Sequence, residues 1–272
     1  MEIKFERYSF SQRLRSMLKV DFRRMFTMPL VYIMLAISFL SPILILVMTT
    51  MMDGSVSVNP QTGEETVIEG FDSTWQIIGS VSGEGSVDTT AAMSMDMMSM
   101  CNINLLYFAA AALVCIFTAD DFRSGYAKNL FAVRAGKADY ILSKTMVCFI
   151  GGGLMIMLFF IGAMLGGTVS GLPFAMTGFN IYNIIMCLLS KMLLISIFIP
   201  IYLLMSVIAK QKLWLSILLS LMVGMFLFMM IPMLTPLNST IMNVILCFAG
   251  GVLLGTGLGA ISTQVLKKTS LV

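Results

Sequence analysis

The stretch RMFTMPLVYIMLAISFLSPILILVMTTMMD, from Arg24 to Asp53, places a long apolar run directly after a group of basic residues. The run from Pro29 to Met52 carries no charge and exceeds the roughly 20 apolar residues that cross the hydrocarbon core of a bilayer. No Lys or Arg follows until Arg123. Because basic residues favour the cytoplasmic side of a membrane, we expect the chain to leave the cytoplasm after Arg24 and to return before Arg123.

The composition of the whole chain is typical of an integral membrane protein. Hydrophobic residues make up 58% of it and charged residues 11%, whereas charged residues make up about a quarter of an ordinary soluble domain. The loop from Asp53 to Met100 contains acidic residues and no basic one, so the rest of the chain is markedly basic. Anionic lipids of the inner leaflet explain this surplus, and we expect no nucleic-acid partner.

Six segments are long and apolar enough to span a membrane. They are 29–52, 101–119, 145–168, 183–208, 213–233 and 241–266. With a cytoplasmic N-terminus, this order places Lys210, Lys212, Lys267 and Lys268 in the cytoplasm as well. The sequence therefore predicts an all-α integral membrane protein with six transmembrane helices, which form a single domain over residues 1–272 with both termini in the cytoplasm.

Residues 1–28 precede the first span and are expected to contain a cytoplasmic amphipathic helix. Apolar residues between Phe10 and Met25 fall near one face of this helix, and Arg13, Arg15, Lys19, Arg23 and Arg24 occupy the other. Such a helix lies in the membrane interface. A plain anchor and an elbow that transmits force from a soluble partner need the same residues, so both interpretations stay open.

Proline and glycine residues mark the interiors of the expected spans. Pro42 and Pro200 should kink their helices or open a local break. Gly251, Gly255 and Gly259 recur every four residues on one face of the last span, and small residues at that spacing allow close helix packing. The pattern fits packing within the chain, and it also fits contact with a second copy.

The residue types present argue against catalysis and against a cofactor in this chain. The sequence has no histidine, so histidine-based acid–base catalysis and zinc ligation by histidine are excluded. The Gly136-Lys137 pair lacks the earlier Gly and the following Ser or Thr of a phosphate-binding loop. The five cysteines are scattered singly, as small buried apolar residues are. A methionine-rich run, Met93–Met100, suits Cu(I) chemically, but an apolar lip of the second span explains it better, and we expect no metal site.

The most specific signal is the segment DDFRSGYAKNL, residues 120–130, which continues to Tyr140-Ile-Leu-Ser-Lys144. It resembles the connection between the second and third spans of ABC-2 type transporter permeases. In that family an acidic residue, an aromatic residue, two variable positions and a Gly close the second span, and a Lys opens the third. Asp121, Phe122, Gly125 and Lys144 match this pattern, whereas Tyr126 stands where Thr is usual.

The resemblance covers the whole chain and implies an ABC-2 (type V exporter-like) permease, similar to the compact six-span permeases of bacteriocin immunity and peptide-toxin export. It implies that residues 120–144 form a cytoplasmic coupling segment, which seats on a cytosolic nucleotide-binding ATPase subunit that holds ATP and magnesium. It also implies a second permease chain, the same or related, in a bacterial cell membrane. The residues that it assigns to the coupling interface are Asp120, Asp121, Phe122, Arg123, Ser124, Gly125, Tyr126, Lys128 and Asn129.

The cargo is less specified by the residues. The spans lack a chain of acidic residues that would carry ions or protons, which favours amphipathic, antimicrobial or toxin peptides as the substrate. Lys191, inside the fourth span, either extends to the outer interface or faces the translocation pathway. The acidic loop over 53–100 either attracts cationic peptides or is simply solvated. An exporter of another cargo (an ion, copper-linked or lipid-like) and a secondary transporter without an ATPase remain alternatives.

The expected topology can be tested by labelling single cysteines in a background without the native ones. A cysteine at Ser86 should react with a membrane-impermeant reagent in intact cells, because the acidic loop is predicted to be outside. A cysteine at Arg134 should react only after permeabilisation. Labelling of position 134 in intact cells would show that the expected coupling segment is not in the cytoplasm.

Overall fold

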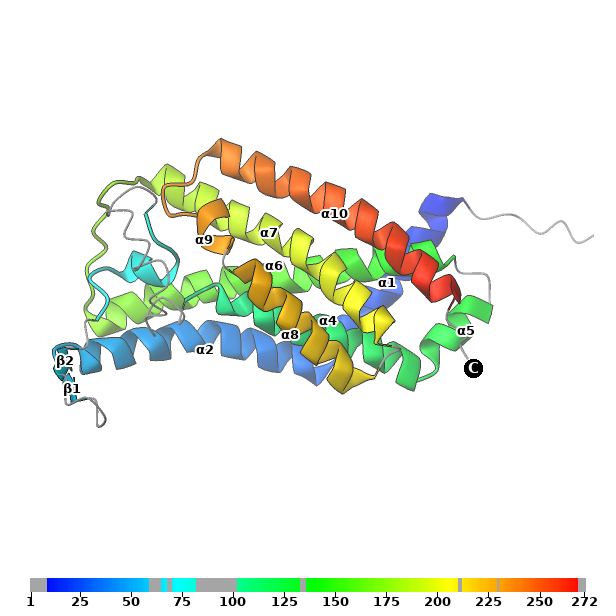
Figure 1. Cartoon of the computed structure of the whole chain (residues 1–272), viewed down its shortest axis with the longest axis horizontal. Coiled ribbons are helices and arrows are strands. Elements are labelled where there is room, and N and C mark those ends of the chain that lie inside the picture. The colour runs from blue at the N-terminus through cyan, green and yellow to red at the C-terminus, as the bar shows by residue number, and fades with distance from the viewer. Residues whose placement is uncertain are drawn as a thin grey trace, which may run out of the picture.

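The computed structural model describes residues 9–58, 65–67, 70–81, 102–132, 136–209, 212–228 and 230–268. Long helices run side by side along the long axis of the molecule (Figure 1). A short β-hairpin lies at one end, which we call the outer end after the topology that the sequence predicts. A short helix, the first helix and the C-terminal end of the last helix lie at the other, which we call the basic end. The Met93–Met100 run, Ser86 and Arg134 fall outside the described residues.

The element bounds define this bundle. The α-helices are α1 (Phe10–Thr27), α2 (Pro29–Met52), α4 (Leu105–Arg123), α5 (Tyr126–Ala132), α6 (Lys137–Ser170), α7 (Ile181–Ile208), α8 (Leu213–Phe228), α9 (Ile231–Leu234) and α10 (Ile241–Lys268). Strands β1 (Val56–Val58) and β2 (Glu65–Val67) pair in antiparallel register, with Val56 opposite Val67. The 3₁₀ helix η1 (Thr74–Ile77) follows them along the chain.

Five helices among the described residues are long and apolar enough to cross a membrane: α2, α4, α6, α7 and α10. The expected span over 213–233 is not one long helix. Its helix α8 has 16 residues, which is about 24 Å against a core of about 30 Å, and the apolar segment continues into α9. Pro232 lies in the first turn of α9, where proline is favoured because that position needs no amide donor. The prediction of a helical, multi-pass membrane protein is confirmed.

The outward faces of the bundle are apolar. Large apolar side chains are exposed along α2, α8 and α10, including Leu44, Phe226 and Leu253, as expected where lipid replaces water as the solvent. The most apolar stretches of α4, α6 and α7 are more buried than those of α2 and α10. Pro42 and Pro200 lie inside continuous helices, so neither opens the local break that the sequence allowed.

Small residues lie where helices approach most closely. Gly251 of α10 faces α7, and a Cβ atom at this position would overlap the hydroxyl of Ser196. The neighbouring glycines of the same face are less tightly packed, because a Cβ at Gly259 would lie 3.8 Å from Ile141. Among the described glycines, Gly162 of α6 lies closest to the backbone of another helix, because its Cβ would overlap the carbonyl oxygen of Phe39 in α2.

Part of the acidic loop is packed into the protein instead of being solvated. Trp75, Ile77 and Ile78 are buried, and backbone hydrogen bonds tie this segment to other connections at the outer end. The amide of Thr74 donates to the carbonyl of Pro173 (3.1 Å), and the amide of Ile103 donates to that of Ile77 (3.0 Å). The buried segment Phe71–Ile78 therefore covers the outer ends of the helices.

The α2–α6 contact generates a prediction about stability. Gly162→Ala should lower the melting temperature of the purified protein, because backbone atoms cannot move aside and overpacking costs roughly 1–3 kcal/mol. Gly153→Ala on the same helix is the matched control. Its Cβ would meet the flexible methyl end of Met192 at 3.4 Å, and helix propensity gains up to about 1 kcal/mol. Equal melting temperatures of the two variants would contradict this packing.

Candidate functional site: a buried ion network at the basic end

The connection from α4 to α6 is a sharp turn followed by a short helix. Gly125 has a positive φ of 74°, a backbone conformation that glycine adopts without strain and that commonly ends a helix. The amide of Ser124 donates to the carbonyl of Asp120 (2.9 Å), and the amide of Asn129 donates to that of Gly125 (3.1 Å). Helix α5 therefore starts at once after α4 and leads back towards α6.

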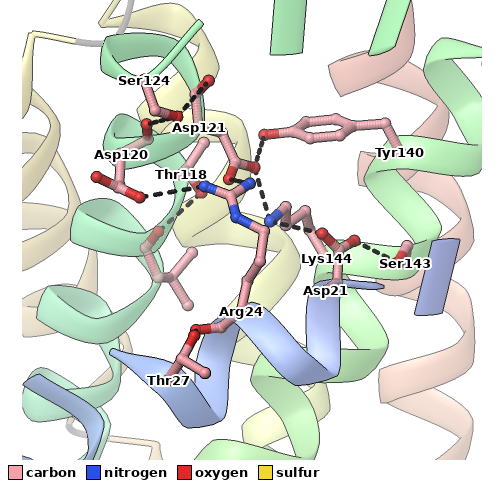
Figure 2. A network of polar contacts seen from close by, with 11 residues as sticks. Asp21, Arg24, Thr27, Thr118, Asp120, Asp121, Ser124, Tyr140, Ser143 and Lys144 are labelled. Carbon is pink, nitrogen blue, oxygen red and sulfur yellow. Dashed lines mark hydrogen bonds and ion pairs between the residues drawn. The ribbon is translucent and has the colours of Figure 1, made fainter. Parts of the chain in front are cut away.

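Asp121, in the last turn of α4, is the centre of a buried ion network (Figure 2). Its carboxylate is fully buried and forms ion pairs with Lys144 of α6 (Nζ to Oδ2, 2.6 Å) and with Arg24 of α1. The hydroxyl of Tyr140 donates a hydrogen bond to the same carboxylate at 2.9 Å. Two cations and a phenol thus compensate one buried anion.

Asp21 of α1 is a second buried carboxylate in this network. It forms an ion pair with Lys144 (Nζ to Oδ1, 3.1 Å) and accepts a hydrogen bond from the hydroxyl of Ser143. The Lys144 ammonium also lies 3.6 Å from the centre of the Phe117 ring, a geometry that favours cations. Lys144 therefore joins a carboxylate of α1 to a carboxylate of α4.

Arg24 links this buried network to the connection with α5. Its guanidinium pairs with Asp121 and with the half-exposed Asp120 (3.1 Å), and it stacks 4.0 Å from the centre of the Tyr126 ring. Burial and the negative charges of Asp21 and Asp121 raise the pKa of Tyr126 to about 12, against a smaller opposing effect of Arg24. The phenol therefore remains protonated at neutral pH, as a neutral stacking partner.

The structure separates the residues of the predicted coupling interface by exposure. Arg123, Ser124, Lys128 and Asn129 are exposed, whereas Asp120, Phe122, Gly125 and Tyr126 are half-buried. Asp121 has no exposed surface. A soluble partner can therefore touch the first group directly, while Asp121 can affect such a partner only by holding α4 in position.

The sequence pattern did not single out Asp21, and it placed Arg24 on the basic, polar face of the amphipathic helix. Met17, Asp21 and Met25 are the buried residues of α1, and their four-residue spacing puts the acid on the same face as the two methionines. An acidic residue on the apolar face of an amphipathic helix was the available signal. Its partner Lys144 lies more than 100 positions away in the sequence, so no local pattern identified the pair.

Lys191 lies inside α7, nearer to the start of that helix than to its end, and it takes no part in this network. Its side chain is fully buried instead of reaching the outer interface. The ammonium donates to Oδ1 of Asn104 and to Oγ1 of Thr235, both at 3.0 Å, and the backbone carbonyl of Lys191 accepts from the hydroxyl of Tyr107 (2.9 Å). Lys191 is also one of the residues that line a cavity of about 680 Å³ at the outer end.

The four cysteines within the described residues are free and buried, as expected: Cys115, Cys148, Cys187 and Cys247.

No family model matches the chain, and no curated protein or solved structure shows a significant similarity to it.

The network predicts that substituting a buried member lowers the stability of the protein much more than substituting an exposed member. Lys144→Met should strongly destabilise the protein, by about 3–5 kcal/mol, because it leaves two buried carboxylates without their shared cation. Asp120→Asn is the matched control, since this carboxylate is half-exposed and exposed pairs contribute about 0–1 kcal/mol. The measurement is thermal unfolding in lipid nanodiscs.

A double-variant comparison separates the ion network from a simple packing defect. If the charge of Asp21 causes the loss, Asp21→Asn should recover part of the stability of Lys144→Met. Purely additive effects of the two substitutions would show that Asp21 and Lys144 do not interact.

Proposed function

We propose that this chain is the permease subunit of an ATP-driven exporter of the ABC-2 type and that it moves amphipathic peptides out of a bacterial cell or its membrane. The energy comes from a separate cytosolic ATPase subunit, which binds ATP and magnesium. This chain is not itself catalytic in the proposal. It pairs with a second permease chain, the same or related, to enclose the pathway.

The observation that carries the proposal is the position of α5. This short helix lies at the basic end, between two long helices that both qualify as membrane spans. Its exposed residues, such as Lys128 and Asn129, are free to contact a soluble partner. The positive charge at this end places it on the cytoplasmic side in the proposal, where an ATPase subunit would be.

The ion network supports a mechanical role for α5. A force applied to α5 acts directly on α4 through the turn at Gly125. Because Arg24 and Lys144 pair with Asp121 of α4, α1 and α6 are connected to the same point. In the proposed mechanism the three helices respond together when the ATPase closes on ATP, and the pathway changes its access.

The proposed topology keeps six crossings with both termini in the cytoplasm. Helices α8 and α9 together make the fifth crossing, with α9 and the following Asn238-Ser239-Thr240 turn at the outer side. The proposed cargo agrees with a chain that holds 27 methionines, because flexible thioether side chains can repack around different apolar surfaces.

The first test is recovery of a functional complex. The tagged chain, purified gently from the membranes of its own organism, should bring a nucleotide-binding subunit with it, and the complex should hydrolyse ATP. The double variant Arg123→Ala/Lys128→Ala removes two exposed charges at the turn and on α5, and it should reduce both recovery of the partner and ATP hydrolysis severalfold.

The matched control is Lys268→Ala, which removes an exposed charge from the last turn of α10 at the same end. It should leave both values close to those of the unmodified chain. A chain that transports peptide in vesicles on an ion gradient alone, without any ATPase, would overturn the proposal in favour of a secondary transporter.

A further inference from the structure

The cavity at the outer end has the size and the wall chemistry of a ligand site. Its volume of about 680 Å³ is within the range of roughly 300–1,000 Å³ that is usual for such sites. Its wall comes from the buried part of the acidic loop, from the start of α4, from the loop before α7 and from the α9 region. Aromatic rings form part of the wall, with Trp75 and Phe179 packed edge to face at 6.3 Å.

Lys191 brings a buried amino group to this cavity, and no acidic side chain of the described residues partners it. Among the described residues, no carboxylate lies within ion-pair distance of its ammonium, and its hydrogen-bond partners Asn104 and Thr235 are neutral. A lysine ammonium has three donors, and these two bonds use two of them. A buried charge that lacks a counter-charge is costly, so an anion bound beside Lys191 supplies the counter-charge that stabilises the protonated amine.

One further donor in the wall lacks an acceptor within the described part of the chain. The indole Nε1 of Trp75 is buried without a hydrogen-bond partner, and Trp75 is only 6% exposed. Asn104 accepts from Lys191 through Oδ1, and its side-chain amide stands in the wall beside that amine. A buried donor without an acceptor costs about 1–3 kcal/mol. An acceptor-rich anionic group is the chemistry that satisfies both Lys191 and Trp75.

We propose that this cavity binds the C-terminal carboxylate of an apolar peptide at the outer face of the membrane. A carboxylate supplies acceptors for Lys191, Asn104 and Trp75, and the aromatic wall accommodates the adjacent side chains. The exposed Asp72 also lines the cavity and suits a cationic group on the same peptide. The lining consists mainly of connections beyond or near the helix ends, which favours a peptide from the aqueous side over a lipid from between the helices.

The two tryptophans of the chain allow a direct binding experiment. Trp214 is 88% exposed near the start of α8 and does not line the cavity, so Trp214→Phe leaves Trp75 as the sole indole reporter. The purified full-length Trp214→Phe protein, in phosphatidylcholine nanodiscs, is titrated with a short acetylated peptide of leucine, phenylalanine and one lysine. The same peptide with a C-terminal amide is the matched ligand. This binding does not depend on an ATPase, so its failure and the failure of the proposed exporter function are distinguishable.

The expected result is a saturable change in Trp75 fluorescence, with at least about tenfold weaker binding of the amidated peptide. Lys191→Met should remove this preference for the carboxylate, whereas Lys268→Met at the basic end should preserve it. Asn104→Asp is an independent variant that does not depend on the tolerance of the fold to losing Lys191. It supplies an internal counter-ion to Lys191, so it should raise the melting temperature and weaken carboxylate binding at least tenfold.

Several outcomes would overturn the proposal. They are an absence of saturable binding, equal affinity for the acid and amide peptides, and unchanged carboxylate preference in Asn104→Asp. Decanoate that binds as tightly as the peptide would assign the cavity to a lipid-like carboxylate instead. Displacement of the peptide by phosphatidylglycerol in the nanodisc would assign it to a lipid headgroup.

Discussion

The packing of the helices at the basic end depends on the ion pairs of the Lys144 ammonium. This ammonium comes from α6 and stands between Asp21 of α1 and Asp121 of α4, with all three side chains fully buried. Buried charges are tolerated only when their partners are in place. The three helices must therefore assemble together, and Arg24 extends the same constraint to Asp120 and to the turn that precedes α5. The direction of α5 follows from this anchoring.

The two buried lysines of the described chain differ in how their amino groups are accommodated in the interior. Lys144 is neutralised by two carboxylates and a ring face, which makes it a structural tie between helices. Lys191 has neutral hydrogen-bond partners and lines a cavity. A cation of the second kind retains attraction for an anion from outside the chain, because nothing within the described residues compensates its charge. In the function proposed, one buried lysine therefore connects helices, and the other recognises an anion.

Several features followed from local sequence properties. The apolar lengths predicted α2, α4, α6, α7 and α10, because a bilayer imposes a minimum span on any helix that crosses it. The family resemblance, and not a local property, implied that the second span closes at Gly125, and α4 ends just before it at Arg123. The segment 213–233 was expected to be one span, because hydropathy adds up apolar residues and does not register that a new helix, α9, starts at Ile231. The surface of α1 was misjudged because Arg24 was counted as a solvated charge.

Length, hydropathy and charge along the chain were enough to identify a helical membrane protein with a strongly basic side, because these properties act locally. Which charges are buried, and with what partners, became visible only in the folded protein. Asp21 forms an ion pair with Lys144, and Lys191 donates hydrogen bonds to Asn104 and Thr235, across large separations in sequence. Such pairings depend on how the helices pack, and a one-dimensional pattern holds no information on which faces will meet.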